Sequence, residues 1–152
     1  MCLSRTTTKK PKIAEEDIIC YKFLKVAGSG FPRRDVRITA PFRTDFQYQL
    51  GKVTKLQPHQ KLECEHHDYV HVGFHSFANV KAAFHNADIR NYPHDPEYFV
   101  FVCVIPKGAK YFVGRFCQHL SYASDALIVL SRNSRRSKQH IKNLPPTAEP
   151  VF

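Results

Sequence analysis

Histidine and cysteine side chains gather in the middle of the chain, and these residue types hold transition metals or carry nucleophilic chemistry. The cluster consists of Cys64, His66, His67, His71, His75 and His85. If 69–75 is a strand, as its alternation predicts, His71 and His75 share a face but lie roughly 13 Å apart. Ligands of one zinc ion each lie about 2 Å from it. We therefore expect polar-face histidines and no metal ligands.

Cys2 is a second candidate for chemistry. Removal of Met1 would expose an N-terminal thiol, an arrangement that resembles N-terminal-nucleophile hydrolases, whose α-amine acts as the base. Such nucleophiles begin a core strand, whereas Cys2 precedes the polar run Thr-Thr-Thr-Lys-Lys. We expect an ordinary residue in a mobile basic segment.

Basic residues are concentrated at the two ends of the chain. Lys and Arg number 23 against 13 acidic residues in 152, a formal net charge of +10. Residues 1–12 and 131–152 carry four net positive charges each, so 13–130 holds only two. The expected organisation is a basic tail over 1–12, one globular domain over 13–130 and a basic, proline-containing tail over 131–152.

The C-terminal tail offers cations to an acidic partner. The residues expected to contact nucleic-acid phosphates or an acidic protein are Arg132, Arg135, Arg136 and Lys138. The alternative is a solvated terminus that keeps the protein in solution.

No stretch of eighteen apolar residues occurs, and no apolar run follows the first charges, so we expect neither a membrane span nor a secretory signal. The five cysteines are irregularly spaced. We therefore expect reduced thiols and an intracellular protein, in the cytoplasm or nucleus.

Apolar and alternating runs predict about six strands and one helix. The predicted strands are 13–26, 35–40, 46–50, 69–75, 98–105 and 126–130, with a short strand or turn at 111–114. Residues 98–105 form the longest apolar run and are predicted as a central strand. Apolar residues at helical spacing predict a helix over 76–89, capped by Ser76. The expected fold class is α+β, with the strands in a mixed or antiparallel arrangement.

Several segments resemble, in order, those of ADP-ribosyltransferases. Residues 73–84 resemble the family's strand end and following helix, and 100–108 resemble its long apolar strand with a following glycine. Residues 122–129 resemble a last strand with an acidic residue at its lip. Residues 20–23 would correspond to the first strand.

This resemblance implies an ADP-ribosyltransferase-like cleft and NAD as its ligand. A carboxylate in such a cleft stabilises the oxocarbenium-like ribose as the nicotinamide leaves. The implied catalytic residue is Asp125, and the implied ligand-binding residues are Tyr21, Lys22, Gly73, Phe74, His75, Ser76, Tyr122 and Ser124. Asp125 stands where the family has Glu, and Lys22 where it has Arg or His, so the resemblance leaves open whether a bond is broken.

The chain also resembles a group of uncharacterised small proteins of phages and large DNA viruses. The shared segments lie at residues 1–3, 21–22, 48–52, 73–77, 105–114 and 122–125. They include Gly-Phe-His-Ser-Phe, Ile-Pro-Lys-Gly and Tyr-Ala-Ser-Asp. The resemblance implies a common fold and a viral or phage setting, with no activity attached.

Polar residues beside glycines and aromatics predict a pocket for a phosphate-bearing ligand. They are Lys52, His75, Ser76, Lys107, Lys110, Ser121 and Ser124. We expect a small viral or phage protein that binds a nucleotide-like ligand of the NAD or ADP-ribose type, with or without catalysis. The alternative is a non-enzymatic interaction protein whose basic tails bind nucleic acid or an acidic host protein. A third reading is a self-associating module that adds an edge strand to a neighbour; the sequence leaves the oligomeric state open.

Overall fold

The structure is a computed structural model that describes residues 3–29, 34–40, 43–91 and 98–133. Its elements are β1 (Lys12–Ile13), β2 (Ile18–Ser29), β3 (Arg34–Ala40), β4 (Arg43–Gln47), β5 (Val53–Lys55), a 3-10 turn (His66–Asp68), β6 (Phe74–Phe77), α1 (Val80–Asn91), β7 (Tyr98–Ile105), β8 (Lys110–Phe116), β9 (His119–Ser124) and β10 (Ala126–Asn133).

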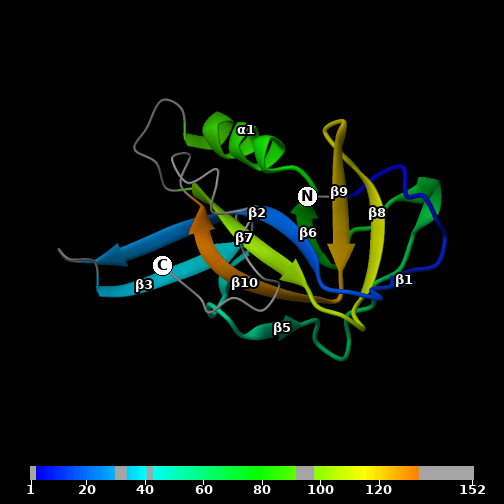
Figure 1. Cartoon of the computed structure of the whole chain (residues 1–152), viewed down its shortest axis with the longest axis horizontal. Helices are drawn as coiled ribbons and strands as arrows, with labels where there is room; N and C mark the ends of the chain where they lie inside the picture. The colour runs from blue at the N-terminus through cyan, green and yellow to red at the C-terminus, as the bar shows by residue number, and fades with distance from the viewer. Residues whose placement is uncertain (1–2, 30–33, 41–42, 92–97, 134–152) are drawn as a thin grey trace.

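Ten strands form one sheet in which every described pairing is antiparallel (Figure 1). The main path runs β1-β8-β9-β6-β2-β7-β10-β5, and β3 and β4 branch from β2. The branch exists because β2 is longer than either neighbour on one of its edges. That edge pairs with β6 at Tyr21 and then with β3 from Lys25 onward.

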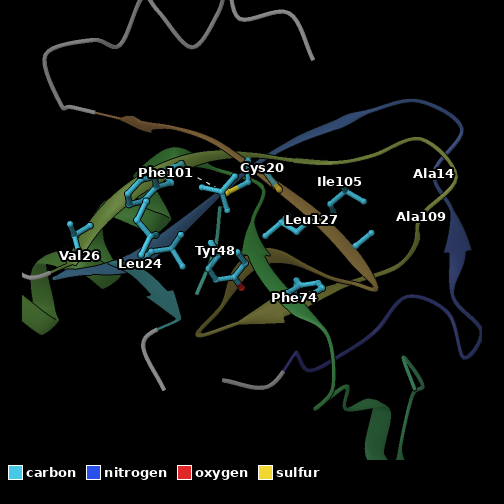
Figure 2. Close-up of a cluster of buried hydrophobic side chains, with 14 residues drawn as sticks. Ala14, Cys20, Leu24, Val26, Tyr48, Phe74, Phe101, Ile105, Ala109 and Leu127 are labelled. Atoms are coloured by element: carbon cyan, nitrogen blue, oxygen red, sulfur yellow. Dashed lines mark hydrogen bonds between the residues drawn. The ribbon is translucent and has the colours of Figure 1, made fainter. Parts of the chain in front are cut away.

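The predicted central strand at 98–105 is confirmed as β7, which lies between β2 and β10. Its side chains alternate between two clusters, as a strand covered on both faces requires. Phe101, Cys103 and Ile105 enter the cluster that we call the central cluster. Figure 2 shows this cluster, where Cys20, Leu24 and Val26 of β2 meet Tyr48 and Phe74.

The opposite face of the sheet is covered by α1 (Figure 1). Val100, Val102 and Val104 of β7 pack there against small residues of the helix. The helix residues that are buried are Ala82, Ala83 and Ala87. Alanines let the helix approach the sheet closely, and we call this group the helix-side cluster.

The N-terminal segment lies on the body of the protein. Leu3 is fully buried and pairs with Val70, and Ser4 pairs with Arg115 at the edge of β8. β1 continues the pairing to Tyr111. Residues 3–12, expected as part of a basic tail, are therefore an outer strand-like strap, which buries Leu3 in a third small cluster.

The prediction of an α+β fold with about six strands and an ADP-ribosyltransferase-like arrangement is wrong. The described chain has ten strands and a single α-helix, so it is a β-dominated fold. Strands such as β5 and β9 were missed because they are short or polar. β5 pairs with β10, and β9 pairs on one edge with β6; these partners are distant in sequence, and a local hydrophobic pattern does not reveal them.

The predicted helix over 76–89 is displaced. Ser76 lies inside β6, opposite Tyr122, and caps no helix. α1 begins at Val80, and the Asn79 side chain accepts a 2.8 Å hydrogen bond from the Lys81 main-chain N–H. Asn79 is thus the N-cap, and the aromatic Phe77 belongs to the sheet.

The C-terminal end of the described chain is still strand. β10 runs to Asn133, so Arg132 lies in the sheet, whereas Arg135, Arg136 and Lys138 lie outside the described residues, as does Cys2. Within the described residues, no helix has the length and apolar character needed to cross a membrane.

Candidate functional site

The predicted ligand-binding residues fall on two faces of the sheet. Phe74 belongs to the central cluster and Phe77 to the helix-side cluster. Alternation along β6 therefore places Ser76 with Phe74, and His75 with Phe77. Lys22 shares the central face with Ser76, whereas Tyr21 belongs to the helix-side cluster. One cleft cannot collect both sets, because the sheet separates them.

Lys22 is a buried cation among apolar side chains. It lies between Cys20 and Leu24 on the central face of β2. Its Nζ donates a 2.6 Å hydrogen bond to the main-chain oxygen of His75. Burial lowers the pKa of Lys22 to about 8, because the charged form loses its water shell. Lys22 thus bridges β2 and β6 where their ladder ends.

His75 is buried on the face of the sheet opposite Lys22, and its side chain is bonded to the main chain four residues earlier. Its Nε2–H donates a 3.0 Å hydrogen bond to the main-chain oxygen of His71. Burial lowers the pKa of His75 to about 4. The imidazole is therefore neutral at pH 7 and acts as a structural donor.

The remaining predicted ligand-binding residues are also structural. Ser124 donates a 2.9 Å hydrogen bond to the Ala126 main-chain oxygen, inside the sheet. Tyr122 packs edge-on against Tyr111, with ring centroids 6.1 Å apart. Gly73 has φ +140°, and an added Cβ would lie 2.8 Å from Leu62 Cδ1, so its role is to let the chain enter β6.

Asp125, the predicted catalytic residue, connects three segments through hydrogen bonds. Its Oδ1 accepts from the Lys110 main-chain N–H at 2.9 Å, and its own N–H donates to the Lys110 oxygen at 3.0 Å. Its main-chain oxygen accepts from the Leu56 N–H at 3.0 Å. Asp125 therefore fixes the start of β8 and the end of β5 on either side of the β9–β10 junction.

These two segments border an open pocket of about 810 Å³. Four lysines line it, against two carboxylates, and we call it the lysine pocket. The lysines are Lys55, Lys61, Lys107 and Lys110, and the acids are Glu63 and Asp125. No ion pair is described between these lysines and a carboxylate of the described residues. The pocket is thus a concave surface with excess positive charge.

The turn between β7 and β8 forms one wall of the lysine pocket, and its main-chain donors are already used. The Lys107 N–H donates to Asp17 Oδ1 at 2.7 Å, and the Gly108 N–H donates to the Ala14 oxygen at 2.8 Å. The Ala109 N–H donates to the Pro106 oxygen. An anion at this wall would consequently be held by lysine ammonium groups, and not by the main-chain amides of the turn.

Apolar surface completes the lysine pocket. The apolar lining residues are Val53, Leu56, Pro58, Leu62, Pro106, Ala109 and Ala126. A ligand with one charged part and one flat, weakly polar part would match both linings.

The predicted phosphate pocket is assembled only in part. Lys107, Gly108 and Lys110 line the lysine pocket, as does Asp125, but Lys52, His75 and Ser76 are not among its lining residues. Sequence reasoning missed Lys55 and Lys61, because they lie outside every predicted strand and helix. The sequence offers no clear signal for them, since 53–68 holds two lysines against three acidic residues.

The histidine and cysteine cluster is dispersed over the fold. His71 pairs with Glu65 at 3.3 Å, Cys64 contacts the Thr6 hydroxyl at 3.3 Å, and His85 lies against His119. In the part of the chain that the structure describes, no three His, Cys, Asp or Glu residues are grouped to hold a metal ion.

The chain matches no protein-family model, and no curated protein and no solved structure matches it significantly. The resemblance to phage and large-virus proteins therefore stays a prediction.

Proposed function

We propose that the protein binds a phosphate-bearing, nucleotide-like ligand in the lysine pocket. The observation that carries the proposal is the convergence of four lysines from two segments distant in sequence, 53–63 and 106–110, on one concave surface. Such a set of ammonium groups suits phosphate oxygens, and the apolar wall suits a base. The volume lies within the usual range for small-molecule sites, about 300–1,000 Å³.

Asp125 has a positioning role in this proposal. Its carboxylate is engaged by the Lys110 main-chain N–H, which makes it a support for the lysines. Nothing in the arrangement requires a bond to be broken, so the proposed function is binding.

The test is a calorimetric titration of the full chain with ADP, ADP-ribose and adenosine. We expect ADP and ADP-ribose to bind, and adenosine to bind at least tenfold more weakly. The double variant Lys107→Gln/Lys110→Gln should weaken ADP binding by roughly tenfold, which is about 1.4 kcal/mol. Lys12→Gln/Lys81→Gln, at two exposed positions outside the lysine pocket, is the matched control and should bind as the wild type does.

Affinity for ADP should also fall with added salt, because lysine–phosphate contacts are screened. The proposal fails if ADP does not bind, or if it binds equally well to the wild type and to the pocket variant.

A second candidate function is nucleic-acid binding by the C-terminal basic segment. Arg132 is an exposed residue of β10, and its guanidinium carbon lies 3.6 Å from the centroid of the Phe99 ring. Arg135, Arg136 and Lys138 follow it in sequence. Replacing those three by Gln should abolish binding of a single-stranded oligonucleotide and leave ADP binding intact. The lysine-pocket variant should do the reverse.

A further inference from the structure

A second pocket lies at the opposite end of the β8–β9 hairpin from the lysine pocket. Its volume is about 590 Å³, and it is lined by Ser4, Arg5, Tyr69, Arg115, Cys117 and Gln118. Two of these residues are arginines, and none of the described lining residues is acidic. We call it the arginine pocket.

The strap and the hairpin bring the two arginines together. Ser4 and Arg115 exchange main-chain hydrogen bonds of 2.8 and 2.7 Å. These bonds hold the strap against β8 at the residue that precedes Arg5. The Arg115 side chain reaches toward the hairpin turn, with Nη1 3.4 Å from the Gln118 oxygen. Both arginines are exposed, and a guanidinium can meet a carboxylate with two parallel hydrogen bonds; in Arg115 one of the five donors is already directed at the Gln118 oxygen.

Cys117 is the exposed thiol of this pocket. Phe116 and His119 are the last ladder pair, so Cys117 and Gln118 are the two residues of the turn. Both have positive φ, 47° and 69°. Such turns favour Asn-Gly, and a side chain in this conformation costs about 1–2 kcal/mol. Turn geometry therefore does not account for a cysteine at this position.

Unusual backbone conformations gather at the arginine pocket. The described non-glycine residues with positive φ are Arg5, Asp68, Cys117 and Gln118. Three of them line the pocket, and Asp68 precedes the lining residue Tyr69. Such conformations are over-represented at functional sites.

We propose that the arginine pocket binds small disulfides that carry carboxylates, and that Cys117 exchanges with them. The Cys117 sulfur, after losing its proton, attacks one sulfur of the bound disulfide. The disulfide bond of the ligand breaks as the new mixed disulfide forms, and the other half leaves as a thiolate that takes up the proton. One thiol and one disulfide are consumed and one of each is produced, so no outside oxidant is needed.

The arginines select the reagent in this proposal. They hold its carboxylates and so raise its concentration beside the thiol. A neutral disulfide gains nothing from them. The charge dependence of the reaction is thus the property that separates a built site from a merely exposed cysteine.

The experiment compares glutathione disulfide, which is anionic, with bis(2-hydroxyethyl) disulfide, which is neutral. The protein is the full chain with Cys2→Ser and Cys64→Ser, and modification of Cys117 is followed by mass spectrometry over time. We expect Arg5→Gln/Arg115→Gln to slow the reaction with glutathione disulfide by about tenfold, and to change the reaction with the neutral reagent by less than twofold. Lys12→Gln/Lys81→Gln, at two exposed positions outside the arginine pocket, removes the same number of charges and should alter neither rate.

Two results would overturn the proposal. If the arginine variant slows both reagents equally, the arginines only maintain the turn. If it slows neither, Cys117 is an exposed thiol without a binding site. The neutral reagent also reports whether the variant keeps its fold, since an unfolded chain would expose the buried Cys20 and Cys103 to modification.

Discussion

The Lys22 ammonium donates to the main-chain oxygen of His75 across the point where β2 and β6 separate. β2 and β6 share one registered pair, Tyr21 with Phe77, before β2 turns to β3. The lysine side chain supplies a donor that the ladder no longer provides. The sheet can fork at this place because a long, flexible cation reaches the carbonyl left behind.

Replacing Lys22 by Met should stabilise the protein at pH 7 by about 1 kcal/mol, because the buried charge is removed and an unpaired carbonyl is the smaller cost. The amine has a pKa of about 8 when folded, against 10.5 when free. Between these two pKa values the unfolded chain binds more protons than the folded chain does. The free energy of unfolding of the wild type therefore rises as the pH rises. The difference between the two proteins should shrink by roughly 1 kcal/mol from pH 7 to pH 9. Urea unfolding at both pH values measures it, and a constant difference would show that Lys22 is hydrated.

His75 should make the fold sensitive to acid. Its pKa is about 4 when folded, against 6.5 when free, so the unfolded chain takes up the proton first. Stability should fall as pH drops from 6.5 to 4, by up to roughly 3 kcal/mol from this residue. His75→Gln should remove most of this dependence of stability on pH, as measured by urea unfolding. His59→Gln, at an exposed position, should keep it. Identical slopes in all three proteins would contradict the burial of His75.

Asp125 should respond differently to two substitutions. Asp125→Asn keeps an oxygen for the Lys110 N–H, so stability should change by less than about 0.5 kcal/mol. Asp125→Ala removes the acceptor of that exposed N–H and should cost about 0.5–1.5 kcal/mol, the net contribution of a typical hydrogen bond. Thermal unfolding of both variants tests this. Equal losses would mean that the charge of Asp125, and not its hydrogen bond, holds the junction.

Gly114 should be required for the N-terminal strap. An added Cβ would lie 2.5 Å from the Ser4 main-chain oxygen and 2.8 Å from Leu3 Cγ. Gly114→Ala should therefore displace the strap, at a cost of about 1–3 kcal/mol. Amide exchange at Ser4 and Arg115 should accelerate more than exchange in β7. Uniform acceleration would instead indicate global destabilisation.

Substitutions in the turn between β8 and β9 should stabilise the protein. Cys117→Asn/Gln118→Gly introduces residues that tolerate positive φ, so the protein should gain about 1 kcal/mol. Chemical unfolding measures the gain, and Cys117→Ser alone, which keeps an unfavourable residue in the turn, should show little of it. A loss of stability in the double variant would mean that the native turn is not strained.

The apolar pattern alone predicted the centre of the sheet. Residues 98–105 are apolar at every position, and only a strand covered on both faces can bury them all. A helix was also expected, but it begins at Val80, after the N-cap Asn79, and not at Ser76, which lies in β6. Local pattern succeeds for the strand because an unbroken apolar run is itself a local property of the sequence.

The sites depended on contacts distant in sequence. The lysine pocket joins Lys55 and Lys61 to Lys107 and Lys110, and the arginine pocket joins Arg5 to Arg115. Side-chain alternation separated His75 from Ser76, although they are neighbours in the chain. Periodicity therefore determined the buried centre of the sheet, and composition determined where the charge lies along the chain. Strand pairing, which satisfies backbone groups across long loops, decided which charges meet and that Leu3 and Lys22 are buried.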